Sequence, residues 1–270
     1  MAEFIQVHRG DAPLIVALPH TGTDLDGYDD AFRSPWLAQR DADWFIDRLY
    51  AFAHALGATT VRTSVSRSVI DVNRDPSGAS LYPGQATTEL VPTTTFDGDP
   101  LYRGDPPDRD EVADRRERFF NPYHAMLQGE IDRLRRSHDR VVLYDAHSIR
   151  SMIPRLFEGE LPQFNVGTNG GETCSAALAE AVLSAIARQP SGDGSVVLNG
   201  RFKGGWTTRH YGKPAQGVHA IQMELAIRGY LREPATPDKG NWPPPYDPVY
   251  AAPMIETLRA VLSACLEFAR

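Results

Sequence analysis

Two short apolar runs without polar alternation stand out in the chain, and each ends in a histidine. Residues 15–20 read Ile-Val-Ala-Leu-Pro-His, and residues 141–147 read Val-Val-Leu-Tyr-Asp-Ala-His. Continuous apolar runs of this length are typical of buried parallel strands. Because ligands bind beyond the carboxyl ends of strands in open α/β sheets, we expect His20 and His147 to reach one crevice. The alternative is that each histidine only hydrogen-bonds near its strand end.

Strands and helices alternate along the rest of the chain. Apolar runs predict strands at residues 13–19, 58–63, 140–146, 196–199 and 218–225. Helical spacing of apolar positions predicts helices at residues 34–56, 109–136, 172–189 and 251–269, the second interrupted near Pro122. Ser34 is the expected N-cap of the first helix, and Gly57 follows its end. This alternation favours an α/β fold with a mainly parallel sheet and helices on both faces.

The connecting segments are irregular, and two of them carry functional signals. Residues 75–110 are rich in Pro, Gly, Thr and Asp, and a loop of that length in a compact domain is usually functional. Residues 200–217 contain five glycines and a basic cluster. Residues 150–171 and 234–248 are also expected to be loops. Since no linker or repeat interrupts the chain, we expect residues 1–270 to form a single catalytic α/β domain.

Composition excludes several classes of partner. The chain has 270 residues, a hydrophobic fraction of 41% and a charged fraction of 23%, which are ordinary for a soluble globular protein. Its net charge of -7 argues against binding to nucleic acid or to anionic membranes. It does not exclude a small anionic substrate, because local arginines can dominate a pocket. The sequence does not predict an oligomeric state.

Cysteine usage and the N-terminal residues favour a cytoplasmic location. Cys174 and Cys265 are the only two cysteines, which rules out a disulfide framework or a cysteine-based zinc site. The first residues lack the basic and apolar regions of a signal peptide. No run approaches 18 apolar residues, so we expect no transmembrane helix.

The two strand-end histidines are candidate metal ligands. A hydrolytic zinc site usually has three protein ligands and one open position, and the third ligand should be His, Asp or Glu. The acidic candidates near His20 in sequence are Asp24, Asp41, Asp43 and Asp47. A solvated or capping role is the alternative for each acid. Zinc is the expected metal, although cobalt and manganese can share such ligands.

Glu224 is a candidate general base. It lies in a strand with apolar neighbours, where a carboxylate is costly unless it is paired or functional. Such a group can accept a proton from a water molecule activated by a metal. The alternative is a buried salt bridge to an arginine.

Two basic segments are candidate anion sites. Arg67, Asn73 and Arg74 lie in the segment 66–74, and arginine can grip a carboxylate through two hydrogen bonds. The alternative is a surface salt-bridge network around Asp71. In the second segment, Arg201, Lys203 and Arg209 are interleaved with glycines. The spacing of those glycines does not match a phosphate-binding loop, and a mobile surface hairpin is the alternative.

Taken together, these segments resemble the N-formylglutamate amidohydrolase (N-formylglutamate deformylase) family. The resemblance covers residues 12 to about 235, and the number and order of its motifs make it specific. The matching pieces are Pro-His-Thr-Gly-Thr at 19–23, Asp-Ala-Asp-Trp-Phe-Ile-Asp-Arg-Leu-Tyr at 41–50, Ser-Arg-Ser-Val-Ile-Asp-Val-Asn-Arg at 66–74, Asn-Pro-Tyr-His at 121–124, Asp-Ala-His-Ser-Ile at 145–149, Leu-Phe-Glu-Gly-Glu-Leu-Pro at 156–162, Asn-Gly-Arg-Phe-Lys-Gly-Gly through Thr-Arg-His-Tyr-Gly at 199–212, and His-Ala-Ile-Gln-Met-Glu-Leu at 219–225.

The resemblance implies a fold and a set of roles. The family is similar to zinc carboxypeptidases and aspartoacylase, which have a phosphorylase/hydrolase-like α/β fold with a mixed, mainly parallel sheet. It implies that two histidines hold zinc, a glutamate is the general base, an Asn-Arg pair binds the substrate carboxylate and a further arginine binds the scissile carbonyl. The matching residues here are His20 and His147, Glu224, Asn73 and Arg74, and Arg67.

One ligand departs from the pattern of those relatives. They place an acidic ligand three residues after the first histidine, where this chain has Thr23. We therefore expect Asp43, in the Asp-Trp-x-x-Asp element, to replace it.

The function implied is hydrolysis of N-formyl-L-glutamate to formate and L-glutamate, in histidine degradation. Arg201, Lys203 or Arg209 would then bind the second substrate carboxylate. The alternatives are the same chemistry on another N-acyl amino acid, such as N-formylaspartate, and a non-catalytic anion-binding protein.

Overall fold

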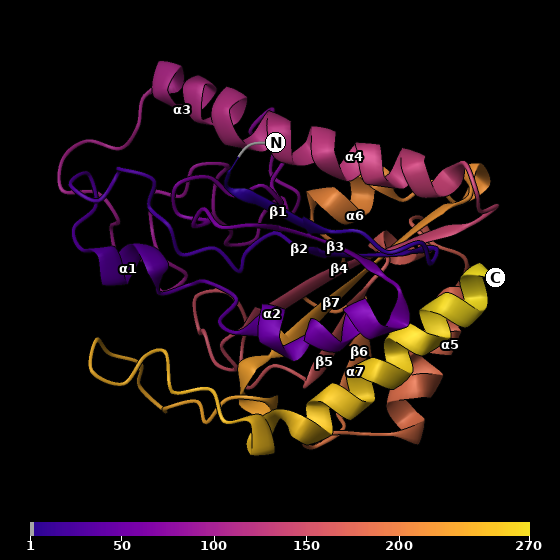
Figure 1. Cartoon of the computed structure of the whole chain (residues 1–270). Helices are drawn as coiled ribbons and strands as arrows, with labels where there is room; N and C mark the ends of the chain where they lie inside the picture. Colours follow the sequence, from indigo (N-terminus) through magenta and orange to yellow (C-terminus); the bar gives the residue numbers. More distant parts are fainter. Residues whose placement is uncertain (1–2) are drawn as a thin grey trace.

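The computed structural model describes residues 3–270 and is built on a seven-stranded sheet in the order β1-β3-β2-β4-β7-β5-β6 (Figure 1). The strands are β1 (Ile5–His8), β2 (Leu14–Leu18), β3 (Thr59–Thr63), β4 (Val141–Ile149), β5 (Phe164–Gly167), β6 (Val196–Leu198) and β7 (Val218–Ala226). Strands β3, β2, β4 and β7 are parallel to one another. Strand β1 is antiparallel to β3, and β5 is antiparallel to β7. The sheet is therefore mixed but mainly parallel, as predicted.

Helices cover both faces of this sheet. Figure 1 shows α3, α4 and α6 on one face and α2, α5 and α7 on the other. The α-helices are α1 (Pro35–Gln39), α2 (Ile46–Leu49), α3 (Arg109–Arg115), α4 (Asn121–Arg135), α5 (Ala176–Arg188), α6 (Trp206–Tyr211) and α7 (Pro248–Ala269). The 3-10 helices are η1 (Ala51–Leu56), η3 (Asn169–Gly171), η4 (Pro214–Gln216) and η5 (Ile227–Gly229), and a π-helical segment, η2, spans Arg116–Phe120.

Strand β2 shows why the apolar runs lack alternation. Leu14, Val16 and Leu18 pack into the core under α5 and α7, whereas Ile15 and Ala17 pack into the core under α4. Because side chains of a strand alternate between the faces, a strand with helices on both faces needs apolar residues at every position.

The prediction of one helix over residues 34–56 was wrong. Ser34 does cap α1, since its side chain accepts a hydrogen bond from Leu37 N, but α1 ends at Gln39. The chain then turns before α2 begins, and Phe45 has a positive φ of 59°. The turn lets Asp43 N donate to His20 O at 2.9 Å, a tertiary contact that a continuous helix would not allow.

Three other segments differ from prediction in detail. Strand β1 was not predicted, and β5 lies within residues 150–171, which were expected to be a loop. The basic segment 200–217 is not only a loop, because it contains helix α6. The interruption predicted near Pro122 is the π-helical segment that immediately precedes α4. Proline lacks a backbone N–H, so a regular helix cannot pass through that position unchanged.

Helix α7 is long and apolar enough to cross a membrane by length and composition alone. Half of its most apolar 18-residue stretch is nevertheless buried inside the protein, and α7 packs on α5. Its apolar residues are thus accounted for by the core, where Leu258, Val261 and Leu262 are fully buried.

Candidate active site

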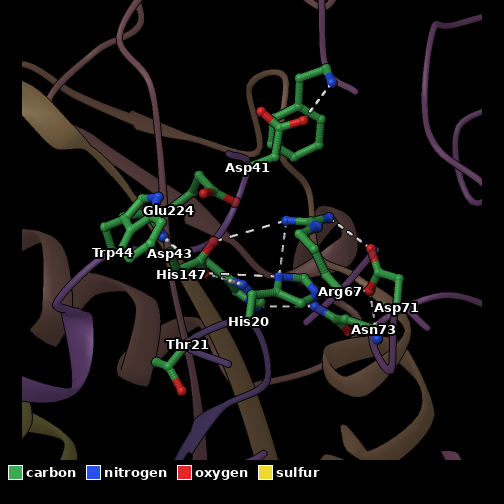
Figure 2. Close-up of polar contacts among 12 residues, drawn as sticks. His20, Thr21, Asp41, Asp43, Trp44, Arg67, Asp71, Asn73, His147 and Glu224 are labelled. Atoms are coloured by element: carbon green, nitrogen blue, oxygen red, sulfur yellow. Dashed lines mark hydrogen bonds and ion pairs between the residues drawn. The ribbon is translucent and has the colours of Figure 1, made fainter. Parts of the chain in front are cut away.

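Three neighbouring strands carry the predicted histidines and glutamate to one edge of the sheet. His20 follows β2, and His147 lies in β4, which pairs with both β2 and β7. Glu224 lies in β7 at the register position opposite His147. The imidazole rings of His20 and His147 are 4.9 Å apart between centroids, and Figure 2 shows Asp43 beside them. The strand ends therefore converge as the apolar runs predicted.

Asp43 completes a group that could hold a metal ion. One ligand atom from each of His20, Asp43 and His147 lies within 4.8 Å of the others. Asp43 Oδ2 is 3.2 Å from His147 Nδ1 and 3.8 Å from His20 Nδ1. Its other oxygen, Oδ1, is buried without a hydrogen-bond partner among the described residues. Two imidazole nitrogens and a carboxylate are a common ligand set for zinc, so these residues fit that metal.

The other acidic candidates lie outside this group of three. Asp24 is exposed and accepts a hydrogen bond from Asp26 N. Asp41 accepts one from Phe96 N at 2.6 Å, and Asp47 pairs with Arg62.

Each histidine is held by a second carboxylate at its far nitrogen. His20 Nε2 donates to Asp71 Oδ1 at 2.6 Å, and His147 Nε2 lies 3.0 Å from Asp145 Oδ1. Such carboxylate–histidine pairs fix the ring so that the opposite nitrogen faces a metal. Sequence reasoning did not assign these two aspartates. The signal for Asp145 is its position two residues before His147, on the same face of β4.

The two histidines have different electrostatic environments. Burial and the charge of Arg67 lower the pKa of His20, which favours the neutral form that binds metals. Burial alone would lower the pKa of His147 as well, but the carboxylates of Asp145 and Asp43 outweigh it and raise that pKa well above its usual value.

Glu224 is buried and almost without partners. Its carboxylate accepts one long hydrogen bond, from Gln222 Nε2 at 3.4 Å. In residues 3–270 no arginine lies within ion-pair distance of it, so the predicted alternative of a buried salt bridge is not observed. Burial raises the pKa of Glu224 to about 8, against the opposing effect of His147. A carboxylate with a raised pKa is suited to accept and return a proton.

Arg67 lies beside His20, Asp43 and Asp71 (Figure 2). Its Nη2 donates to Asp71 Oδ2 at 2.7 Å, and its Nη1 is 3.2 Å from His20 Nδ1. The guanidinium carbon of Arg67 also lies 4.7 Å from the centroid of the Phe96 ring. Arg67 is thus a fixed positive charge at the wall of the cavity.

The cavity in front of Glu224 encloses about 550 Å³ of empty space, part of it at the mouth that opens to solvent. Arg74 and Arg201 both line it, together with Asn73. The amide of Asn73 is engaged within the protein, because its Nδ2 donates to Asp145 Oδ2 at 3.2 Å and its Oδ1 accepts from Thr207 N at 2.8 Å.

Two of the predicted basic residues do not line this cavity. Lys203 is exposed, and Arg209 donates through Nε to Gly204 O at 2.9 Å. Arg209 lies in α6, which begins just after the positive-φ residue Gly204.

Comparison with known proteins decides the family. The sequence pattern of N-formylglutamate amidohydrolases matches residues 12–231. The chain belongs to the N-formylglutamate amidohydrolase family. Its relatives include an N-formylglutamate deformylase of Pseudomonas aeruginosa, 45% identical over 99% of this chain and 96% of that protein. An N-formylglutamate deformylase of Pseudomonas putida is 46% identical over 86% of this chain and 87% of that protein.

Two solved structures have the same fold as this chain. An N-formylglutamate amidohydrolase from Ralstonia eutropha JMP134 has a TM-score of 0.76 and 22% identity, covering 100% of this chain and 99% of that one. A gene product of Agrobacterium tumefaciens has a TM-score of 0.67 and 17% identity, covering 98% and 92%. The family resemblance predicted from the sequence motifs is confirmed.

Proposed function

We propose that this protein hydrolyses N-formyl-L-glutamate to formate and L-glutamate in a metal-dependent reaction. The observation that carries the proposal is the group of His20, Asp43 and His147 beside the nearly unpartnered carboxylate of Glu224. The choice of N-formyl-L-glutamate as substrate rests on the two Pseudomonas relatives, which are named N-formylglutamate deformylase. As part of the same proposal, the reaction belongs to histidine degradation and takes place in the cytoplasm.

We assign His20, Asp43 and His147 as the residues that would hold the metal, with zinc as the expected ion and cobalt or manganese as substitutes. When bound, a zinc ion acts as a Lewis acid and lowers the pKa of water toward 7. Asp71 and Asp145 lie at the Nε2 atoms of the two imidazoles, and the Nδ1 atoms of both lie within 4 Å of Asp43 Oδ2.

Glu224 moves the proton in this proposal. Water adds to the formyl carbon, and Glu224 accepts the proton that the water loses. The carbon–nitrogen bond then breaks, and Glu224 returns that proton to the leaving amine, which gives formate and L-glutamate. Arg67 donates to the oxygen of the formyl group as negative charge develops there, and one such donor is typically worth about 2.7–4 kcal/mol.

Arg74 and Arg201 are the proposed carboxylate-binding groups. Arg74 would bind one substrate carboxylate and Arg201 the other, since both line the cavity. Asn73 supports Arg74 through its backbone, because Arg74 Nη1 donates to Asn73 O at 3.3 Å. We favour Arg201 over Lys203 and Arg209, which do not line the cavity.

A substrate panel tests this assignment against its alternatives. We expect purified protein loaded with zinc to release formate from N-formyl-L-glutamate with a kcat/KM at least tenfold above that for N-formyl-L-aspartate. The reverse order would assign the same machinery to the shorter substrate. Absence of formate release from every N-formyl amino acid tested would favour a non-catalytic anion-binding protein.

A further inference from the structure

Arg201 is a cation without an acidic partner at the cavity wall. Its Nε donates to Leu156 O at 2.8 Å and its Nη2 to Ala86 O at 2.6 Å. No carboxylate of residues 3–270 lies within ion-pair distance of this guanidinium. Arg74 lines the same cavity. Arg74 Nη2 lies 3.6 Å from Asp71 Oδ2, so Arg201 is the cation of this pair whose charge is left for an anionic ligand.

Tyr82 packs against Arg201 from the long irregular segment. The Arg201 guanidinium carbon is 5.2 Å from the centroid of the Tyr82 ring, and that of Arg209 is 5.1 Å from it. The Tyr82 hydroxyl donates to Gly204 O at 2.9 Å. Tyr82 therefore contacts Arg201 through its ring and is fixed in place through its hydroxyl.

The backbone around Tyr82 is a tight turn. Gln85 N donates to Tyr82 O at 3.1 Å, and Gly84 has a positive φ of 77°. A proline followed by a glycine with positive φ is the sequence preferred in a type II turn, and Pro83-Gly84 has that form. The exposed turn keeps the Tyr82 ring directed inward, where it lines the cavity.

The same segment also holds the second guanidinium. Arg74 Nε donates to Thr88 O at 3.0 Å, and its Nη2 donates to Thr88 Oγ1 at 3.1 Å. Residues 82–88 thus contact Arg201 through Tyr82 and Ala86, and Arg74 through Thr88. One short segment fixes the position of both cations relative to each other.

We propose that Tyr82 is a positioning residue for substrate recognition, which holds Arg201 where it meets the side-chain carboxylate of a dicarboxylic N-formyl amino acid. This inference rests on the proposed function. It assigns the preference for an acidic side chain to Tyr82 acting through Arg201. The chemistry at the formyl group does not depend on Tyr82, whose hydroxyl donates to Gly204 O and makes no hydrogen bond with His20, Asp43, His147 or Glu224.

The test compares N-formyl-L-glutamate with N-formyl-L-glutamine, its neutral isostere, in zinc-loaded Tyr82→Leu. Loss of this partly buried cation–π contact should lower the ratio of the two kcat/KM values, N-formyl-L-glutamate over N-formyl-L-glutamine, by about tenfold. We expect the loss to come from a higher KM for N-formyl-L-glutamate, with kcat within about threefold of the wild type. Tyr82→Phe keeps the ring and loses the hydroxyl, so it should give a smaller loss of the same kind.

Tyr250→Leu is the matched control. Tyr250 also packs under a guanidinium, that of Arg232 at 4.5 Å, and its hydroxyl also donates to a backbone oxygen, Arg228 O at 2.7 Å. It lies in α7 and does not line the cavity, so the ratio should stay at the wild-type value.

The outcomes separate the two proposals. Equal losses on both substrates in Tyr82→Leu, or a wild-type ratio in both Tyr82 variants, would overturn the role of Tyr82. If Tyr82→Leu does not fold, the ratio in Tyr82→Phe decides in the same way. A wild-type protein that does not hydrolyse N-formyl-L-glutamate would instead overturn the proposed function.

Discussion

Single side chains in this protein combine burial with missing partners, and that combination marks the candidate site. The carboxylate of Glu224 is 7% exposed and has one hydrogen bond of 3.4 Å, while Asp43 Oδ1 is buried with none. Buried carboxylates are normally paired, since leaving one unpaired costs stability. Arg67 Nη1 lies 3.9 Å from Asp43 Oδ1, whereas Glu224 has no ion-pair partner in residues 3–270. A group that binds during the reaction is therefore the expected partner of Glu224.

Replacing Glu224 tests its role in proton transfer. Glu224→Gln keeps the size of the side chain but cannot accept the proton, so kcat should fall by about 10²–10⁴-fold. The zinc content should remain one per chain, because Glu224 is outside the ligand group. Formate release and metal analysis on the same sample measure both quantities.

Glu233→Gln is the control for that change. Glu233 is a partly buried carboxylate that accepts from Ser151 N at 2.9 Å and does not line the cavity, so its replacement should leave kcat within about twofold. A Glu224→Gln variant with near-normal kcat would remove Glu224 from the mechanism.

The position of Asp145 behind His147 leads to a prediction about zinc affinity. Asp145→Asn removes the carboxylate that lies 3.0 Å from His147 Nε2, so zinc affinity should fall by about 10–100-fold. Competition with a chromophoric chelator measures this affinity. Asp47→Asn, which changes an aspartate that pairs with Arg62 outside the group, should leave it unchanged. Equal affinities in all three proteins would contradict the role given to Asp145.

Helices and strands that are determined by the local sequence pattern could be predicted. Those that are determined by tertiary contacts could not. The runs ending in His20 and His147 predicted β2 and β4, and hence the convergence of the two histidines. The residues 40–45 follow helical spacing, yet the chain turns there to bring Asp43 N to His20 O. Asp43 was therefore suggested by family resemblance and not by periodicity. Short strands such as β1 and β5 have little pattern of their own, because pairing with β3 and β7 defines them.

The packing of the Gly-rich segment before α6 can be tested by substitution of its glycines. A Cβ on Gly205 would lie 2.4 Å from Asn73 Nδ2, so Gly205→Ala must displace either the backbone or the Asn73 amide. We expect a loss of about 1–3 kcal/mol in the free energy of unfolding, measured by urea denaturation. Gly104→Ala is the control, because nothing lies within 4 Å of its Cβ and the effect should stay within about 0.5 kcal/mol. Equal stabilities of the two variants would contradict this packing.

At the scale of the whole molecule, this acidic protein contains a basic cavity. The net charge is -7, yet Arg67, Arg74 and Arg201 all line the cavity. The net charge alone could therefore not reveal this basic cavity. The strand order, which puts β4 between β2 and β7, was also beyond sequence pattern, although it determines which side chains meet.

Stability of the whole chain should depend on pH through His124. Burial lowers the pKa of His124 to about 4, whereas an unfolded histidine titrates near 6.5. Between these values the unfolded chain binds a proton that the native chain does not. The stability contributed by neutral His124 is thus fully present above pH 6.5 and is lost as pH falls toward 4, by about 3 kcal/mol.

Urea denaturation from pH 7 to pH 4 measures this effect. His124→Gln should show a weaker decline of unfolding free energy with falling pH than the wild type, by about one proton at the steepest point. Parallel curves for the two proteins would show that His124 is not buried in its neutral form.

Removal of the metal with a chelator is the decisive experiment for a metal-dependent deformylase. Formate release from N-formyl-L-glutamate should be measured before chelation, after removal of the metal and after addition of one equivalent of zinc per chain. We predict loss of at least 95% of activity on chelation and recovery on zinc addition, with no recovery in a His20→Ala variant. Full activity in protein shown by metal analysis to contain no metal would rule out a metal-dependent reaction.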